Sequence, residues 1–258
     1  MRDLNVTLIQ SDLYWQDAIR NCEHFEALMA PFAAQTDLIV LPEMFNSGFS
    51  MQPAAVAQRD DGETVQWLKT QAAHLDTAIC GSLAVKTEVG YANRFVFVTP
   101  QGEISHYDKR HLFRMSNEHE YYEAGQAREI IEYRGWRILP QICYDLRFPV
   151  WSRNQHDYDL AIYVANWPKP RRKAWRTLLQ ARAIENQCYC IGVNRIGMDG
   201  NDLEYAGDSL VVDYLGELVV DQKEGMAFCE TTQLSTSKLA AFKEKFPAWM
   251  DGDQFTID

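Results

Sequence analysis

The chain has 258 residues, 47% of them hydrophobic, and a formal net charge of −11 at pH 7. This length and apolar content allow a sizeable buried core and exclude wholesale disorder, so we expect one large α/β domain or two small ones. The acidic balance argues against nucleic acid as a partner and against anionic membrane surfaces, whereas a small anionic substrate needs only local Arg or Lys side chains.

Short apolar runs separated by turn residues predict strands along most of the chain. These runs lie at 6–10, 38–42, 77–85, 94–100, 136–146, 159–166 and 188–196, with two more strands within 209–220. Apolar residues at helical spacing predict helices at 16–33 and 171–187, and a third with Leu239 and Phe246 on one stripe. Some strands are apolar on both faces and others alternate, which predicts one layered α/β domain over residues 1–258.

The six cysteines show no CxxC pair and no histidine partners at zinc-ligand spacing. The N-terminal apolar run is too short for a signal peptide or a membrane span, and no later stretch approaches transmembrane length. We therefore expect a cytoplasmic protein with reduced thiols and without a metal or an organic cofactor.

Polar residues directly after apolar strands are the first candidates for a site, because strand ends deliver side chains to a cleft. Glu43 follows the run at 38–42, where Pro42 fixes the backbone, and Lys109 follows a short strand. Cys143 ends an apolar run, after which the chain turns. Taken singly, these residues are more readily interpreted as a surface carboxylate, a solvated charge and a buried structural cysteine.

The turn after Cys143 distinguishes this thiol from the other five cysteines, which lie in apolar stretches or lack polar neighbours. Free backbone N–H groups at a strand-to-helix turn can lower the pKa of a thiol and can bind an oxyanion. We expect a helix to open at Phe148-Pro149, since proline is tolerated in a first turn.

In combination, the segments LPEMF, DKRHLF and CYDLRFP, in this order and at this separation, resemble the carbon–nitrogen hydrolase (nitrilase) superfamily. The downstream segments ANWPKPR, LLQARAIENQCY and GDSLVVDYLGE extend the resemblance over nearly the whole chain. The resemblance implies a four-layer-forming α-β-β-α sandwich that forms a homodimer through helices. It also implies a catalytic triad, which here consists of Glu43, Lys109 and Cys143.

The resemblance further implies a second glutamate between the lysine and the cysteine. Counting back from the family's glycine, Gly125 here, the matching residue is Glu118, with Glu120 and Glu123 as neighbouring alternatives. The segments ANWP, ARAIENQ and FPAWMDGDQF together resemble the ω-amidases, which hydrolyse the terminal amide of α-keto acids such as α-ketoglutaramate and α-ketosuccinamate. The expected partner is therefore a small-molecule amide substrate.

Amide hydrolysis by this set needs a nucleophile, a base and a donor to the oxyanion. Glu43 can activate Cys143 and then pass the proton to the leaving nitrogen, which leaves a thioester for water to hydrolyse. Lys109 and the backbone N–H of Tyr144 would stabilise the oxyanion, and losing one such donor costs about 2.7–4 kcal/mol. Glu118 could orient Lys109 or contact the substrate, and we favour the orienting role.

An ω-amidase must also bind a carboxylate and a keto group. Arginines suited to bidentate carboxylate binding occur four residues after the nucleophile and at the start of the helix predicted at 171–187, where the helix terminus favours anions. For each arginine, a surface charge or a structural ion pair is as plausible as a role in substrate binding. For Trp167, a position in the core or at an interface is as plausible as a position in the pocket. The candidate substrate-binding residues are Tyr144, Arg147, Asn166, Trp167, Lys169, Arg171 and Arg172.

Several alternatives remain open at this level. A general aliphatic amidase, a carbamoylase or a nitrilase would use the same triad. A non-catalytic binding protein would be expected to lack a triad member, and a thiol redox protein would need a resolving cysteine close to Cys143. His111 or His119 could form a Cys–His pair, although Glu43 and Lys109 already supply the base and the positive charge.

Overall fold

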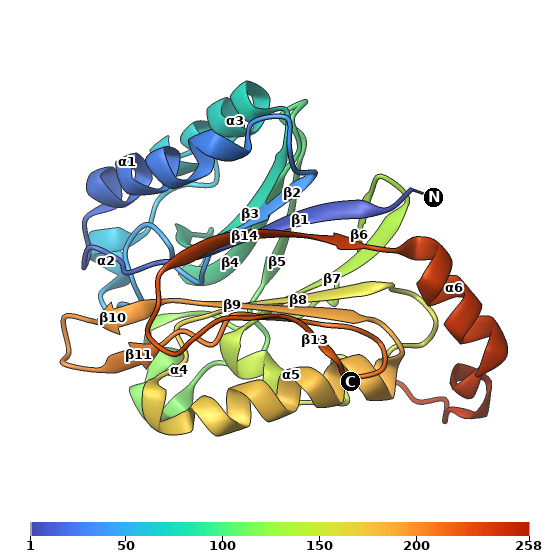
Figure 1. The fold of residues 1–258 in the computed structure, drawn as a ribbon. Helices are drawn as coiled ribbons and strands as arrows, with labels where there is room; N and C mark the ends of the chain where they lie inside the picture. The colour runs from blue at the N-terminus through green and yellow to red at the C-terminus, as the bar shows by residue number, and fades with distance from the viewer. Residues whose placement is uncertain (1, 258) are drawn as a thin grey trace.

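The computed structural model describes residues 2–257 and consists of two facing six-stranded sheets with helices on their outer faces (Figure 1). The first sheet has the order β14-β1-β2-β3-β4-β5 and the second the order β13-β12-β9-β8-β7-β6, while β10 and β11 form a separate hairpin. This architecture confirms the expected α-β-β-α sandwich.

Strands and helices alternate in parts of the chain, whereas the six strands between residues 189 and 234 follow one another without a helix. The first sheet contains β1 (Leu4–Gln10), β2 (Leu38–Val40), β3 (Ala78–Lys86), β4 (Tyr91–Val98), β5 (Ile104–Asp108) and β14 (Phe228–Leu234). The second contains β6 (Ile131–Tyr133), β7 (Trp136–Ile142), β8 (Leu160–Ala165), β9 (Tyr189–Asn194), β12 (Leu210–Val212) and β13 (Leu218–Asp221), and the hairpin contains β10 (Ile196–Met198) and β11 (Glu204–Ala206). The α-helices are α1 (Ala18–Met29), α2 (Pro53–Val56), α3 (Glu63–Leu75), α4 (Glu118–Tyr121), α5 (Arg172–Asn186) and α6 (Thr236–Lys245). Short 3-10 helices are η1 (Ala30–Phe32), η2 (Arg114–Ser116), η3 (Cys143–Arg147), η4 (Lys169–Arg171) and η5 (Ala248–Asp251).

Apolar side chains fill the spaces between the layers. The inner faces of the two sheets pack on each other through residues such as Val6 and Ile162, which are fully buried. Helices α1 and α3 cover the outer face of the first sheet with Phe25 and Leu68, and α5 covers the second with Trp175 (Figure 1). Each large apolar side chain buried in this way contributes about 1.5–3 kcal/mol to folding.

The structure differs from the expected elements in several places. Strand β7 ends at Ile142 rather than at residue 146, because the chain turns into η3 at Cys143. Pro149 opens no helix but lies in the turn that follows η3, so the expected helix start there is wrong. Helix α3 and the strands β6, β10, β11 and β14 are not predicted by the apolar pattern, and most residues of β14 are only partly buried.

Parallel strands bring the expected site residues to one edge of each sheet. Strands β2 and β3 run parallel, as do β7 and β8, so their carboxyl ends lie side by side. Glu43 follows β2, Cys143 follows β7 and Asn166 follows β8. The pairing of Ile142 with Val164 confirms that the strand before Asn166 lies beside the strand before Cys143.

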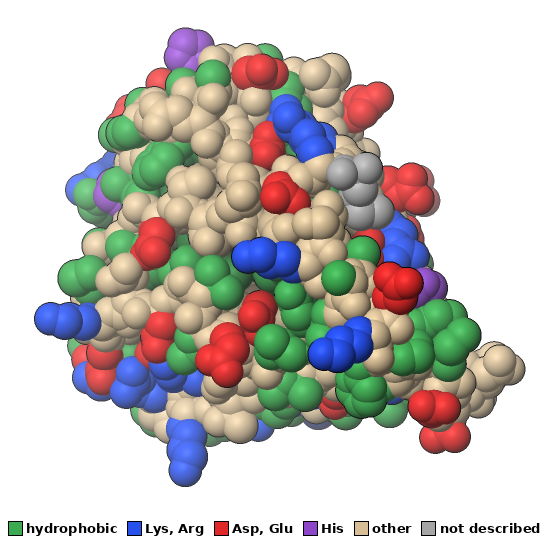
Figure 2. All heavy atoms as spheres, turned by 45° about the vertical axis from the view of Figure 1, so that its right-hand side comes forward, with side chains coloured by type: hydrophobic (Ala, Val, Ile, Leu, Met, Phe, Trp, Pro, Cys, Tyr) green, Lys and Arg blue, Asp and Glu red, His purple; other side chains and the backbone are tan. Residues whose placement is uncertain are grey.

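The molecular surface mixes acidic and basic side chains, and hydrophobic side chains gather near the lower right of the face in Figure 2. After α6 the chain carries exposed Phe246, Trp249 and Met250. The expected apolar stripes on α1 and α5 are buried only in part, since Ile19 and Ile184 are 69% and 53% exposed. The homodimer stays a prediction.

No helix within residues 2–257 combines the length and the apolar character that crossing a bilayer requires.

Candidate active site

Lys109 lies between two carboxylates at the centre of a buried polar cluster. Its Nζ donates to Oε1 of Glu43 at 2.9 Å and to both carboxylate oxygens of Glu118 at 3.0 Å. All three side chains are fully buried, which strengthens these charge-assisted hydrogen bonds. Glu120 and Glu123 are exposed, so Glu118 is the glutamate that the structure brings to the lysine.

Asn93 on β4 belongs to the same cluster, although no sequence motif indicated it. Its Nδ2 donates to Oε1 of Glu43 at 2.8 Å and to Oε1 of Glu118 at 3.3 Å. Its Oδ1 accepts from the hydroxyl of Ser82 at 2.8 Å, which fixes the amide with its nitrogen toward the carboxylates. The one signal in the sequence is the asparagine directly before the apolar run at 94–100, and only the structure shows that it is buried.

Replacing Asn93 with leucine should lower kcat for amide hydrolysis about tenfold or more, because two buried carboxylates lose a donor. The measurement is steady-state kinetics together with thermal unfolding. Ser82→Ala is the milder comparison, since it removes only the hydroxyl behind the amide and should have a smaller effect on kcat. A wild-type kcat in Asn93→Leu would show that Lys109 and the backbone donors hold the two carboxylates without Asn93.

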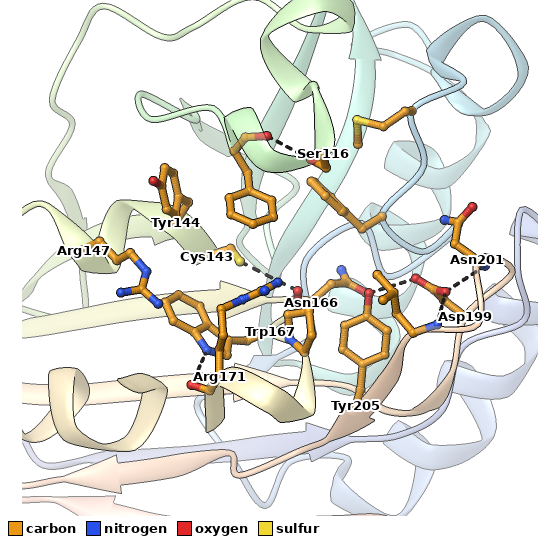
Figure 3. A pocket seen from close by; sticks show the side chains of 15 residues that line it. Ser116, Cys143, Tyr144, Arg147, Asn166, Trp167, Arg171, Asp199, Asn201 and Tyr205 are labelled. Carbon is orange, nitrogen blue, oxygen red and sulfur yellow. Dashed lines mark hydrogen bonds between the residues drawn. The ribbon is translucent and has the colours of Figure 1, made fainter. Parts of the chain in front are cut away.

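Asn166 holds the Glu43 carboxylate from the other sheet. Its backbone N–H donates to Oε2 of Glu43 at 2.7 Å, and its Nδ2 donates to the Glu43 carbonyl at 2.6 Å. The Asn166 carbonyl lies 3.9 Å from Sγ of Cys143, as the dashed line in Figure 3 marks. Asn166 therefore connects the carboxylate to the segment that contacts the thiol.

Cys143 begins η3 with a φ of 45°, a left-handed conformation that is rare for a residue other than glycine. Burial raises the pKa of this thiol well above its ordinary value, and the Glu43 carboxylate raises it further while Lys109 opposes both. The expectation that the N–H groups of the turn lower the pKa is therefore wrong, because desolvation and the carboxylate outweigh them. The resting thiol is neutral and needs a base.

The charges around Lys109 keep it protonated. Burial by itself lowers the pKa of Lys109, but the Glu118 and Glu43 carboxylates together raise it above the ordinary value. Burial also raises the pKa of Glu118, an effect that Lys109 opposes and Glu43 reinforces. The cluster thus presents a fixed ammonium beside the thiol at neutral pH.

A small cavity of about 90 Å³ has Cys143 in its lining (Figure 3). Apolar side chains such as Phe49 and Leu203 line much of it. The β10–β11 hairpin contributes a further wall, where Asp199 accepts a hydrogen bond from the Tyr205 hydroxyl at 2.9 Å. The pocket therefore has mostly apolar walls, with Cys143 as part of its lining.

Two arginines of this pocket have no carboxylate within ion-pair distance in the part of the chain that the structure describes. The Arg147 guanidinium lies over the Trp167 ring, 5.0 Å from its centroid, and that of Arg171 lies 5.3 Å from the centroid of Phe113. Stacking on an aromatic ring holds a guanidinium without neutralising its charge. Both arginines are thus available to an anion in the pocket.

The neighbouring basic residues are engaged in ion pairs. Arg172 pairs with Asp208 at 2.7 Å, and Lys169 pairs with Glu204 at 2.7 Å. The structure therefore separates Arg171 from these two candidates, which the sequence pattern does not. Tyr144 also lines the pocket, directly after the nucleophile candidate.

The histidines do not form a pair with the thiol. Nδ1 of His111 lies 2.7 Å from Oδ1 of Asp145, and His119 is exposed. Within residues 2–257, no group of three or more His, Cys, Asp or Glu side chains has the arrangement of a metal site. The Cys–His alternative is therefore not supported by the geometry.

Comparisons with known proteins all point to the same protein family. Residues 5–239 match the family model described as carbon-nitrogen hydrolase. The omega-amidase YafV of Escherichia coli is 51% identical over 257 residues, with 100% of both chains covered. The 2-oxoglutaramate amidase of Bacillus subtilis is 31% identical, over 95% of this chain and 96% of that protein.

A solved structure extends the likeness to the fold. A CN-hydrolase superfamily protein from Xanthomonas campestris, with an arsenic adduct in its active site, matches with a TM-score of 0.98. The two chains are 48% identical and each is covered over 100% of its length. These likenesses confirm the expected superfamily and fold. This chain belongs to the carbon–nitrogen hydrolase family, as an amidohydrolase of the nitrilase superfamily.

Proposed function

We propose that this enzyme is an ω-amidase, which releases ammonia from the terminal amide of α-keto dicarboxylate monoamides such as α-ketoglutaramate and α-ketosuccinamate. The observation that carries the proposal is the pair Arg147 and Arg171, both without an ion-pair partner in the described chain, on the pocket that has Cys143 in its lining. Unneutralised guanidinium groups favour a carboxylate in an otherwise acidic protein. The names of the relatives from Escherichia coli and Bacillus subtilis support the same activity.

In the proposed mechanism, Glu43 accepts the proton of the Cys143 thiol, which is neutral at rest because its pKa is raised by burial. Sγ attacks the amide carbon to form a tetrahedral oxyanion. Glu43 then returns the proton to the nitrogen, and the carbon–nitrogen bond breaks. Ammonia departs, and the acyl group remains bound to Sγ as a thioester. Glu43 next takes a proton from water, whose oxygen attacks the thioester, and the acid leaves as the thiol regains its proton.

Lys109 is proposed to stabilise the oxyanion. One ammonium proton can lie between the two oxygens of Glu118, both at 3.0 Å, and a second donates to Glu43 at 2.9 Å. The third proton is then free for the substrate oxygen. The backbone N–H of Tyr144, near the start of η3, is the second proposed donor. Glu118 orients the ammonium in this scheme.

The pocket supports recognition of a short anionic chain. Its apolar walls suit the methylene groups between the amide and the keto acid, and the arginines suit the distal carboxylate. Trp167 donates through Nε1 to the Arg171 carbonyl at 2.9 Å, which fixes the indole under Arg147. A general aliphatic amidase, a carbamoylase or a nitrilase with the same triad is the alternative. An uncharged aliphatic amide or nitrile gives Arg147 and Arg171 no anion to bind, and the substrate panel below separates a carbamoyl compound from a keto acid amide.

Arg171→Gln tests the substrate assignment. The variant should lower kcat/KM for α-ketoglutaramate by roughly ten- to a hundredfold, because one charge-assisted hydrogen bond to the substrate is lost. Hydrolysis of butyramide, which has no carboxylate, should change little. Arg172→Gln is the matched control, since that arginine is already paired with Asp208.

The measurement is ammonia release from a panel that contains both amides, a nitrile and a carbamoyl compound. Wild-type enzyme should prefer α-ketoglutaramate strongly over butyramide. Equal rates on the two amides would reject the ω-amidase assignment and leave the amidohydrolase class intact.

A further inference from the structure

The buried carboxylate of Asp145 accepts four hydrogen bonds beside the active site, and no step of the proposed mechanism uses it. Its Oδ2 accepts from the Tyr107 hydroxyl at 2.9 Å and from the backbone N–H of Ile142 at 3.0 Å. Its Oδ1 accepts from the backbone N–H of His111 at 2.9 Å and lies 2.7 Å from Nδ1 of the same residue. Asp145 is 0% exposed, so these donors replace its hydration.

The four donors belong to the two chain segments that carry the proposed nucleophile and ammonium. Ile142 directly precedes Cys143, and Asp145 lies in the 3-10 helix that Cys143 begins. Tyr107 lies two residues before Lys109 and His111 two residues after it. A single carboxylate therefore joins the turn of the thiol to the segment of the lysine.

Two local contacts fix the Asp145 carboxylate and its partners in place. The hydrogen bond from Ile142 to Asp145 closes the turn around Cys143, whose φ of 45° needs support from its surroundings. The His111 ring stacks on Phe148 with centroids 3.9 Å apart and planes inclined by 5°. This stack holds Nδ1 toward Asp145, and a nitrogen facing a carboxylate carries the proton.

We propose that Asp145 is a positioning residue that sets Sγ of Cys143 relative to Nζ of Lys109, with His111 as its orienting partner. It acts through these two residues and contacts no reacting atom. The proposal rests on the roles proposed for Cys143 and Lys109 and not on the identity of the amide. Without the Asp145 carboxylate, the Cys143 thiol and the Lys109 ammonium remain but lose their alignment. A misplacement of a reacting group by about 1 Å can lower the rate of a reaction about a hundredfold.

The test compares Asp145→Asn with the wild-type enzyme. Asparagine keeps the size of the side chain but turns an NH₂ group toward donors that need an acceptor. We expect kcat for ammonia release to fall about a hundredfold while KM stays within about twofold. The rate at which iodoacetamide labels Cys143, followed by mass spectrometry, should fall in parallel. His111→Phe keeps the ring stack, removes Nδ1, and should lower kcat about tenfold.

A second buried carboxylate supplies the control. Asp159 pairs with Arg137 at 2.9 Å and with Lys243 at 3.1 Å, away from the pocket. Asp159→Asn should lower the Tm and leave kcat unchanged, which separates lost stability from lost alignment. If Asp145→Asn does not fold, His111→Phe decides the question.

A wild-type kcat and labelling rate in the folded variants, or a loss confined to KM, overturns the positioning role. A wild-type enzyme that releases no ammonia from α-ketoglutaramate rejects the proposed substrate instead. In that event the Cys143 labelling rates still test the alignment, because iodoacetamide reacts without a bound substrate.

Discussion

Replacing Cys143 with alanine is expected to abolish amide hydrolysis, with a loss in kcat of about 10⁴-fold or more. Without Sγ no thioester can form, and water would have to attack an unactivated amide. The thiol makes a long hydrogen bond to the Asn166 carbonyl at 3.9 Å and packs against buried apolar side chains. Alanine keeps part of this packing, so the fold should remain intact. Ammonia release from α-ketoglutaramate and thermal unfolding are the two measurements.

Cys229→Ala is the matched control for this loss, because Cys229 is also partly buried but lies on β14, outside the pocket. Activity should be unchanged in that variant. Mass spectrometry of the wild-type enzyme during turnover should find an acyl adduct on Cys143 and on no other cysteine. Substantial activity in Cys143→Ala would exclude the thioester route.

Replacing Glu43 with glutamine should lower kcat by about 10²–10⁴-fold, the range for loss of a general base. Glutamine has the same shape but cannot take the proton of the thiol or return it to the leaving nitrogen. It also turns an amide toward Lys109 and the Asn166 N–H, both of which donate to the carboxylate. Steady-state kinetics at neutral pH measures the effect.

The pH dependence of this variant provides a sharper test. Because the pKa of the Cys143 thiol is raised by burial, the thiolate fraction grows about tenfold for each pH unit through the neutral range. The residual rate of Glu43→Gln should follow that slope, whereas the wild type should not, since its base removes the proton within the complex. A residual rate independent of pH would contradict the proposed role of Glu43.

Much of the fold follows from local sequence pattern. Apolar runs mark strands such as β2 and β8 because a strand covered on both faces buries every side chain. The stripe on α5 marks its buried face with Trp175 and Leu179. The apolar pattern does not predict strand β14, because its residues are mostly half exposed. Its position depends instead on pairing with β1, which lies more than two hundred residues away in the sequence.

The sequence by itself determined which residues could do chemistry. Glu43 and Cys143 each follow an apolar strand within a short motif, so their position depends on local structure alone. The family resemblance added Lys109 and a second glutamate. These assignments needed no knowledge of how distant segments pack.

Only the tertiary structure decided what surrounds those residues. It selected Glu118, added Asn93 and, within the residues it describes, gave Arg171 no ion pair beside the ion-paired Arg172. It also reversed the expected direction of the Cys143 pKa shift. The physical reason is that burial and pairing depend on residues far apart in the chain, as in the Glu43–Lys109 contact, which spans 66 residues.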